Sequence, residues 1–169
     1  LAAGAVLLAI GMLGWLSGAA GQAVPDLLLA VDLTAGLVSL GILQGRAETL
    51  VEREAHALFF PHGLGHMVGL GVRDASGRLA GRPPDPRPSL RTLRMDLPLA
   101  AGYVVTVEPG LYFIPELLHA PDRRERFRDC VNWARVDQLM GIGGVRIEDD
   151  VRVTDSAPEV LTAGIPKGL

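Results

Sequence analysis

The sequence predicts a mixed α+β fold, and three observations support this prediction. Apolar residues recur at helical spacing between residues 47 and 58, with charged residues on the remaining faces. The stretch 103–107 is almost entirely β-branched, which is typical of a strand covered on both faces. Glycine and proline are abundant, at 21 and 12 of 169 residues, and this abundance favours turns between short strands over a helical bundle.

Length, charge and cysteine content narrow the class of protein. A chain of 169 residues is long enough for one domain with a real core. The net charge of -3 offers no basic surface for a nucleic acid, so we expect no nucleic-acid partner. The single cysteine, Cys130, excludes an internal disulfide and a cysteine-based zinc cluster within one chain. We therefore expect a cytoplasmic protein.

The first thirty residues form an apolar segment of uncertain role. Residues 1–24 contain no charged residue, and this length could span a bilayer as a helix. No lysine or arginine precedes Arg46, so a signal for membrane orientation is absent. Three interpretations stay open: a membrane-inserted or interfacial helix, a buried helix of a soluble fold, or a stretch whose upstream part is missing. We therefore separate residues 1–30 from a globular part, residues 31–169. A second helix is expected over 27–43, across this boundary, with a stop at Gly41 or Gly45.

A glycine-spaced histidine pair lies at residues 61–66, which read Pro-His-Gly-Leu-Gly-His. Side chains alternate between the two faces of a strand, so in a strand His62, Leu64 and His66 would share one face. Two imidazoles on one face indicate a site. The other interpretation of the same residues is a glycine-rich loop with two solvated histidines.

Two glutamates follow stretches that look like buried strands. Glu108 comes directly after residues 103–107, and Glu148 belongs to an apolar–arginine–apolar strand over 143–150, where it shares a face with Arg146. A buried, ionised carboxylate needs a partner, such as a metal ion, an arginine or several donors. Each glutamate alone could instead be a turn residue. One histidine with two carboxylates suits a hard or borderline ion such as manganese better than structural zinc.

Three motifs in this order resemble the C-terminal part of the catalytic domain of the Xaa-Pro peptidases of metallopeptidase family M24. They are Phe-Phe-Pro-His-Gly-Leu-Gly-His (59–66), Thr-Val-Glu-Pro-Gly-Leu-Tyr-Phe (106–113) and Gly-Gly-Val-Arg-Ile-Glu-Asp-Asp (143–150). Residues 90–94 and 131–133 look closer to the prolidase (Xaa-Pro dipeptidase) branch than to aminopeptidase P. The resemblance covers about residues 40–169. It implies part of a pita-bread fold, a curved and mainly antiparallel sheet backed by helices.

The resemblance also implies an activity and a metal. Such enzymes are exopeptidases that hydrolyse the bond before proline in a dipeptide or short peptide. Their sheet holds two divalent ions, usually manganese or cobalt, with zinc a further candidate, and these ions hold a bridging water. Carried over position by position, His66, Glu108 and Glu148 would be metal ligands, and Glu108 would also shuttle protons.

Four further residues receive roles from the same resemblance. His62 would act in catalysis within the substrate pocket, and Arg94 would meet the carboxylate of a dipeptide. Arg146 would steady the site, and Arg73 would contact substrate where the family usually has a histidine. An arginine there can donate hydrogen bonds but cannot act as a neutral base. The resemblance leaves homodimer formation open.

The sequence departs from the family pattern at two metal ligands. The five-ligand site also uses two aspartates from an upstream hairpin, whereas only Asp26 and Asp32 precede the histidine pair, in an apolar context that does not match. One expectation is therefore a fragment of an Xaa-Pro peptidase that is inactive or impaired alone. The other is a catalytically inactive pita-bread module that binds peptides or partners. A membrane-tethered form that uses residues 1–24 is the weakest expectation.

Overall fold

The computed structural model describes residues 23–74, 81, 85–91, 93 and 95–167. The chain divides into two compact units by its internal contacts. The described part of unit 1 lies mainly in His62–Pro109 and Ile147–Leu169, and unit 2 consists of Leu27–Pro61 and Gly110–Arg146. Each unit contains a small antiparallel sheet, so the predicted mixed α+β class is confirmed.

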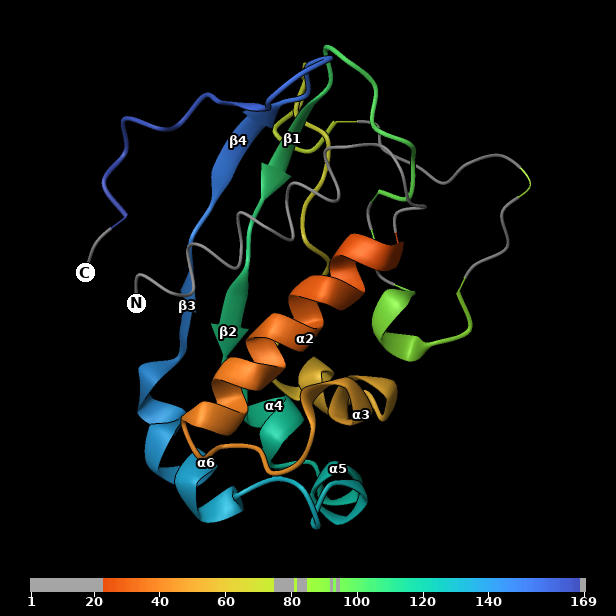
Figure 1. Ribbon diagram of the computed structural model, residues 1–169. Helices are drawn as coiled ribbons and strands as arrows, with labels where there is room; N and C mark the ends of the chain where they lie inside the picture. Colours follow the sequence, from red (N-terminus) through yellow and green to blue (C-terminus); the bar gives the residue numbers. More distant parts are fainter. Residues whose placement is uncertain (1–22, 75–80, 82–84, 92, 94, 168–169) are drawn as a thin grey trace. The chain divides into compact units, whose positions relative to one another are not determined.

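Unit 1 is built on a three-stranded sheet with the order β1-β4-β5. Strands β1 (Val104–Val107) and β4 (Asp149–Arg152) run side by side in opposite directions (Figure 1). Strand β5 (Glu159–Val160) pairs with β4, and the short 3-10 helix η2 spans Pro88–Leu90. Val105 lies opposite Val151, and both side chains are fully buried. The strand predicted over 103–107 is therefore confirmed, and apolar burial holds it against β4.

Residues 61–67, which contain the histidine pair and are called the histidine stretch below, run antiparallel to β1. The amide of Glu108 donates to the carbonyl of Leu64, and the amide of Thr106 donates to the carbonyl of His66, each at 2.8 Å. Gly65 lies so close to β1 that a Cβ there would come within 1.9 Å of the Thr106 carbonyl oxygen. Only a glycine permits this approach. Of the two interpretations of residues 61–66, a strand or a glycine-rich loop, the structure has no regular strand there, and one isolated bridge follows at Met67.

Unit 2 contains most of the helices. They are α2 (Ala23–Ser39, which lies in unit 2 from Leu27 on), α3 (Ala47–Glu52), η1 (Ala55–Leu58), α4 (Pro115–Leu118), α5 (Pro121–Arg126), α6 (Trp133–Leu139) and η3 (Met140–Ile142). Strands β2 (Gly110–Tyr112) and β3 (Gly144–Arg146) form a two-stranded antiparallel sheet. The core is a cluster of buried aliphatic and aromatic side chains, in which the Phe59 and Phe113 rings meet edge to face at 5.8 Å.

The helices of unit 2 differ from the sequence prediction at one point. Residues 47–58 were expected to form one amphipathic helix, but α3 ends at Glu52 and η1 begins at Ala55. Glu54 has a φ of 64°, in the left-handed region, and this conformation interrupts the helix. The predicted stop at Gly41 agrees with the structure, because α2 ends at Ser39 and Gly41 has a φ of 70°.

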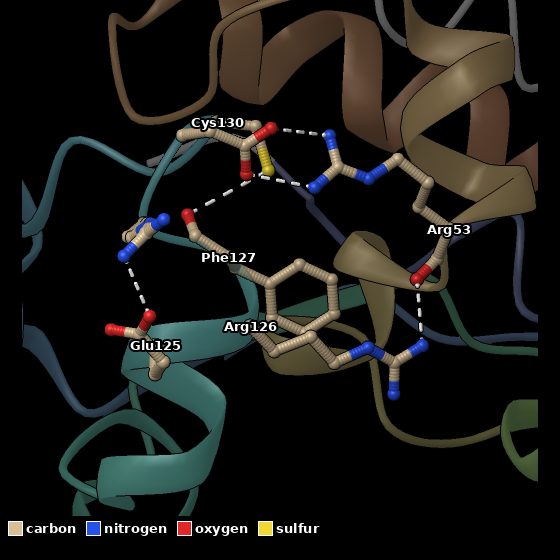
Figure 2. Close-up of polar contacts among 7 residues, drawn as sticks. Arg53, Glu125, Arg126, Phe127 and Cys130 are labelled. Atoms are coloured by element: carbon tan, nitrogen blue, oxygen red, sulfur yellow. Dashed lines mark hydrogen bonds and ion pairs between the residues drawn. The ribbon is translucent and has the colours of Figure 1, made fainter.

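Exposed ion pairs bind the loops of unit 2 together. Arg53 donates two hydrogen bonds to Asp129, at 2.8 and 2.9 Å, and these bonds hold the pKa of Asp129 below its ordinary value. Arg126 donates to the carbonyl oxygen of Arg53, and the Arg53 guanidinium extends toward the turn at Cys130 (Figure 2). Burial raises the pKa of the Cys130 thiol. This cluster therefore ties the end of α3 to the loop between α5 and α6.

Within the described residues, none of the helices has both the length and the apolar character needed to cross a bilayer. Residues 1–22 lie outside the described part of the chain. The predictions for residues 1–24, and the division between residues 1–30 and 31–169, therefore stay predictions.

Candidate metal centre

Three of the residues predicted from the sequence lie together in unit 1. His66, Glu108 and Glu148 each offer one ligand atom, and these atoms lie within 4.8 Å of one another. The pairing of the chain explains how they meet. Glu108 immediately follows β1, Glu148 immediately precedes β4, and the last residue of β1 lies opposite the first residue of β4. The histidine stretch pairs with β1, and this pairing places the His66 imidazole beside the two glutamates.

The imidazole of His66 faces the carboxylate of Glu108. His66 Nδ1 lies 2.9 Å from the carbonyl oxygen of Met67, and because a carbonyl can only accept, Nδ1 must carry the hydrogen. Nε2, which carries a lone pair in the neutral imidazole, lies 3.3 Å from Glu108 Oε1. The two side chains are 5% and 7% exposed, so water screens them little. Two lone pairs at this distance repel one another unless a cation, either a proton or a metal ion, lies with them.

The arrangement fits a divalent ion. Ligand atoms held about 2.1 Å from one ion lie about 3 Å apart, which is close to the separation of Nε2 and Oε1. A backbone carbonyl that fixes the Nδ1 hydrogen, and so leaves Nε2 to coordinate, is the usual support for a metal-bound histidine. The second carboxylate, Glu148, adds a further oxygen donor. One imidazole and two carboxylates suit manganese, cobalt or zinc.

Thr106 connects the two buried ligands and was missed by the sequence analysis. Its side chain is almost fully buried, at 2% exposure. The Thr106 hydroxyl accepts the backbone N–H of His66 at 3.0 Å and donates to Glu108 Oε1 at 3.1 Å. The two-residue spacing of Thr106 and Glu108 was the available signal, because residues at i and i+2 lie on one face of a strand.

Glu148 differs from the prediction in two respects. It was expected to be buried, but its side chain is exposed. It was also expected to lie on a continuous strand over 143–150 and to share a face with Arg146. Instead β3 ends at Arg146 and β4 begins at Asp149, because β3 pairs with β2 whereas β4 pairs with β1. The change of partner leaves Glu148 in the connection between two strands.

The other predicted residues are placed as follows. His62 is half-buried in unit 1, and its Nδ1 donates to the carbonyl oxygen of Gly63 at 2.8 Å. Arg73 is exposed in the turn after the histidine stretch. Arg146 is the exposed last residue of β3, in unit 2. Arg94 lies outside the described residues. Their proposed roles toward substrate therefore stay predictions.

Known proteins resemble the chain in sequence and in structure. Residues 27–155 match the model of metallopeptidase family M24. Human Xaa-Pro dipeptidase is 43% identical over 126 residues, which cover 75% of this chain and 26% of the human enzyme. The structure of Pseudomonas aeruginosa aminopeptidase PepP matches with a TM-score of 0.66 and 30% identity, over 98% of this chain and 31% of that one.

A second solved structure is zinc-substituted Escherichia coli aminopeptidase P in complex with product. It matches with a TM-score of 0.58 and 35% identity, over 86% of this chain and 26% of that one. The chain thus spans between 26% and 31% of the proteins compared. The family match extends over most of the chain and includes His66, Glu108 and Glu148, and the chain therefore belongs to metallopeptidase family M24, of which it holds a partial domain.

Proposed function

We propose that this chain contributes His66, Glu108 and Glu148 to the divalent-metal centre of an Xaa-Pro peptidase. The observation on which the proposal depends is the buried contact between His66 Nε2 and Glu108 Oε1, at 3.3 Å, with a second carboxylate close by. Because the three ligand atoms lie close together, one divalent ion can bind all three residues. The likeness to a dipeptidase and to aminopeptidases supports this peptidase class.

The buried carboxylate of Glu108 is the group that would move a proton. Its Oε1 is held by the Thr106 hydroxyl, so the side chain has a fixed orientation. In the proposed reaction Glu108 accepts a proton from the attacking water at a carboxylate oxygen and delivers it to the proline nitrogen as the peptide bond breaks. The bound divalent ion would supply Lewis acidity, which polarises the scissile carbonyl and lowers the pKa of the attacking water.

The proposed substrate is a dipeptide or short peptide that contains proline. The relatives include both a dipeptidase and aminopeptidases, so either product pattern agrees with the comparisons. Four residues are proposed to bind substrate or assist its reaction: His62, Arg73, Arg94 and Arg146. The curved, pita-bread form of the sheet belongs to the same proposal, supported by the match to aminopeptidase P over most of the chain.

A second candidate is a catalytically inactive module of the same fold that binds peptides or partners. One observation favours it for the chain by itself. Glu148 is exposed, whereas His66 and Glu108 are buried, so one of the three candidate ligands is open to solvent.

Release of proline from Gly-Pro and Ala-Pro, with and without added Mn²⁺, separates the two candidates. The assay compares the unmodified protein with its Glu108→Gln variant. Metal-dependent release that disappears in Glu108→Gln supports the peptidase. Manganese binding without release supports the inactive module, and release that Glu108→Gln leaves unchanged would refute the role of Glu108.

A further inference from the structure

We infer that the C-terminal segment, residues 159–167, is a positioning device for the metal ligand Glu148. The inference rests on the proposed metal centre. Two residues of this segment, Thr162 and Lys167, converge on the carboxylate of Asp149, the residue that directly follows Glu148. We call these two residues the C-terminal clamp.

Thr162 holds two consecutive residues with a single hydroxyl. Its Oγ1 donates to Asp149 Oδ1 and accepts the backbone N–H of Asp150 at 3.1 Å. A hydroxyl has one hydrogen and can accept at its lone pairs, so both bonds form together. The threonine therefore fixes the Asp149 side chain and the backbone directly after it.

Lys167 binds the same carboxylate, that of Asp149. Its Nζ lies 3.0 Å from Asp149 Oδ1 and donates to the carbonyl oxygens of Thr162 and Ile165, each at 3.1 Å. An ammonium group has three hydrogens, and these three acceptors use all of them. The Lys167 and Asp149 side chains are only 27% and 24% exposed, so solvent screens this ion pair less than a typical surface pair.

The clamp begins where the regular pairing of β5 ends. Val160 pairs with Val151, and the Leu161 amide donates to the Asp150 carbonyl at 2.8 Å. The next contacts along β4, toward its first residue, are the side-chain bonds to Asp149. On the other side of β4, Asp149 lies opposite Val107, the last residue of β1, which directly precedes Glu108. The clamp therefore secures the end of β4 where Glu148 and Glu108 emerge.

The clamp lies beside the more exposed of the two carboxylate ligands. Glu108 is buried and its Oε1 is bonded to Thr106, whereas Glu148 is exposed in the connection between β3 and β4. The backbone at Asp149 and Asp150, which the clamp holds, helps to set the position of Glu148. Hydrogen bonds made directly to a ligand commonly change metal affinity by about 10- to 100-fold, and the clamp, which acts one residue from Glu148, should fall at the lower end of this range. We therefore assign Thr162 and Lys167 as positioning residues, distinct from the ligands themselves.

Matched variants test the clamp without touching a ligand. Thr162→Val removes the hydroxyl at nearly constant volume, and Thr162→Ser keeps it. The control is Thr154→Val, because Thr154 is also half-buried and its hydroxyl likewise accepts an amide, from Ser156, and donates to a carbonyl, that of Ala157. Lys167→Met provides a second test at the exposed end of the segment.

The first measurement is amide hydrogen exchange in the metal-free chain. We expect exchange at Asp150 to be about tenfold faster in Thr162→Val, because its acceptor is lost. Thr162→Ser should restore the slow rate, and Thr154→Val should leave it unchanged. Unchanged exchange in both Thr162→Val and Lys167→Met would overturn the clamp.

The second measurement is Co²⁺ affinity, followed by visible absorption. We expect Thr162→Val to bind Co²⁺ about tenfold more weakly, with Thr162→Ser and Thr154→Val close to the unmodified chain. Faster exchange with unchanged Co²⁺ affinity would overturn the link from the clamp to Glu148. Absence of Co²⁺ binding by the unmodified chain would instead refute the proposed metal centre, and the exchange rates distinguish that result from a failure of the clamp.

Discussion

Among the described residues, a polar cluster of unit 2 and a polar cluster of unit 1 have opposite character. In unit 2, the pairs Arg53–Asp129 and Arg124–Asp137 are exposed, and each carboxylate has a guanidinium as its partner. In unit 1, the cluster of His66, Thr106 and Glu108 is buried, and a nitrogen of the imidazole faces a carboxylate oxygen. The exposed pairs join a carboxylate to a guanidinium at the surface, whereas the buried contact brings together two kinds of ligand atom that one cation can share. Burial and the combination of ligand atoms therefore distinguish the candidate site from the structural ion pairs.

Forcing the histidine stretch away from β1 should cause the largest loss of stability and of metal binding. In Gly65→Ala the new Cβ would lie 1.9 Å from a backbone oxygen of Thr106, so the pairing must shift. We expect a loss of about 3 kcal/mol or more in the free energy of unfolding, together with loss of metal binding. Chemical denaturation measures the first and Co²⁺ titration the second.

The control for this change is Gly36→Ala in α2, where a Cβ would meet nothing within 4 Å. It should keep or raise stability, by up to about 1 kcal/mol, because alanine favours a helix. Equal stability of the Gly65→Ala and Gly36→Ala variants would contradict the close approach of the histidine stretch to β1.

Removing the hydroxyl that connects the buried ligands should lower stability and metal affinity by an intermediate amount. Thr106→Val leaves the His66 amide and Glu108 Oε1 without this partner, which we expect to lower the free energy of unfolding by about 1–3 kcal/mol. Metal affinity should fall about tenfold. Thr106→Ser keeps the hydroxyl and should recover most of the affinity. If the serine variant binds Co²⁺ no better than the valine variant, the hydroxyl does not position Glu108.

The sequence predicted the parts of the site that depend on local pattern. The β-branched run before Glu108 identified β1, and the motifs identified His66, Glu108 and Glu148 as residues that meet. These features depend on residue type and short spacing, which a sequence displays directly.

The remaining features depend on contacts between distant residues. The break between β3 and β4, which exposes Glu148, arises because the two strands pair with different partners, β2 and β1. No local signal marks the left-handed Glu54 either, because glutamate rarely adopts that conformation. The hydrogen bond between the His66 amide and Thr106 joins residues 40 positions apart, so the sequence displayed only the two-residue spacing of Thr106 and Glu108.

Neutralising the carboxylate of an exposed ion pair should cause the smallest loss of stability, and this loss should depend on pH. The hydrogen bonds from Arg53 lower the pKa of Asp129, so this pair contributes stability above the ordinary aspartate pKa. The contribution is lost as the pH falls through the lowered pKa of the folded state. Asp129→Asn should therefore lower Tm slightly near pH 7, by no more than about 2 °C, and the difference should vanish in acid.

Thermal unfolding between pH 7 and pH 2 measures this difference. A difference in Tm that grows as the pH falls would contradict the assigned direction of the pKa. A large loss of Tm at pH 7 would remove the contrast between the exposed pairs and the buried cluster.

Equilibrium dialysis with Mn²⁺ tests the central claim most directly, because it asks whether the buried contact of His66 and Glu108 attracts a divalent ion. The matched variants are His66→Ala and His119→Ala, the second of which removes an exposed histidine of unit 2. We predict saturable binding of fewer than two ions per unmodified chain, retained in His119→Ala and lost in His66→Ala. Equal binding by all three proteins would contradict the assignment of the metal centre.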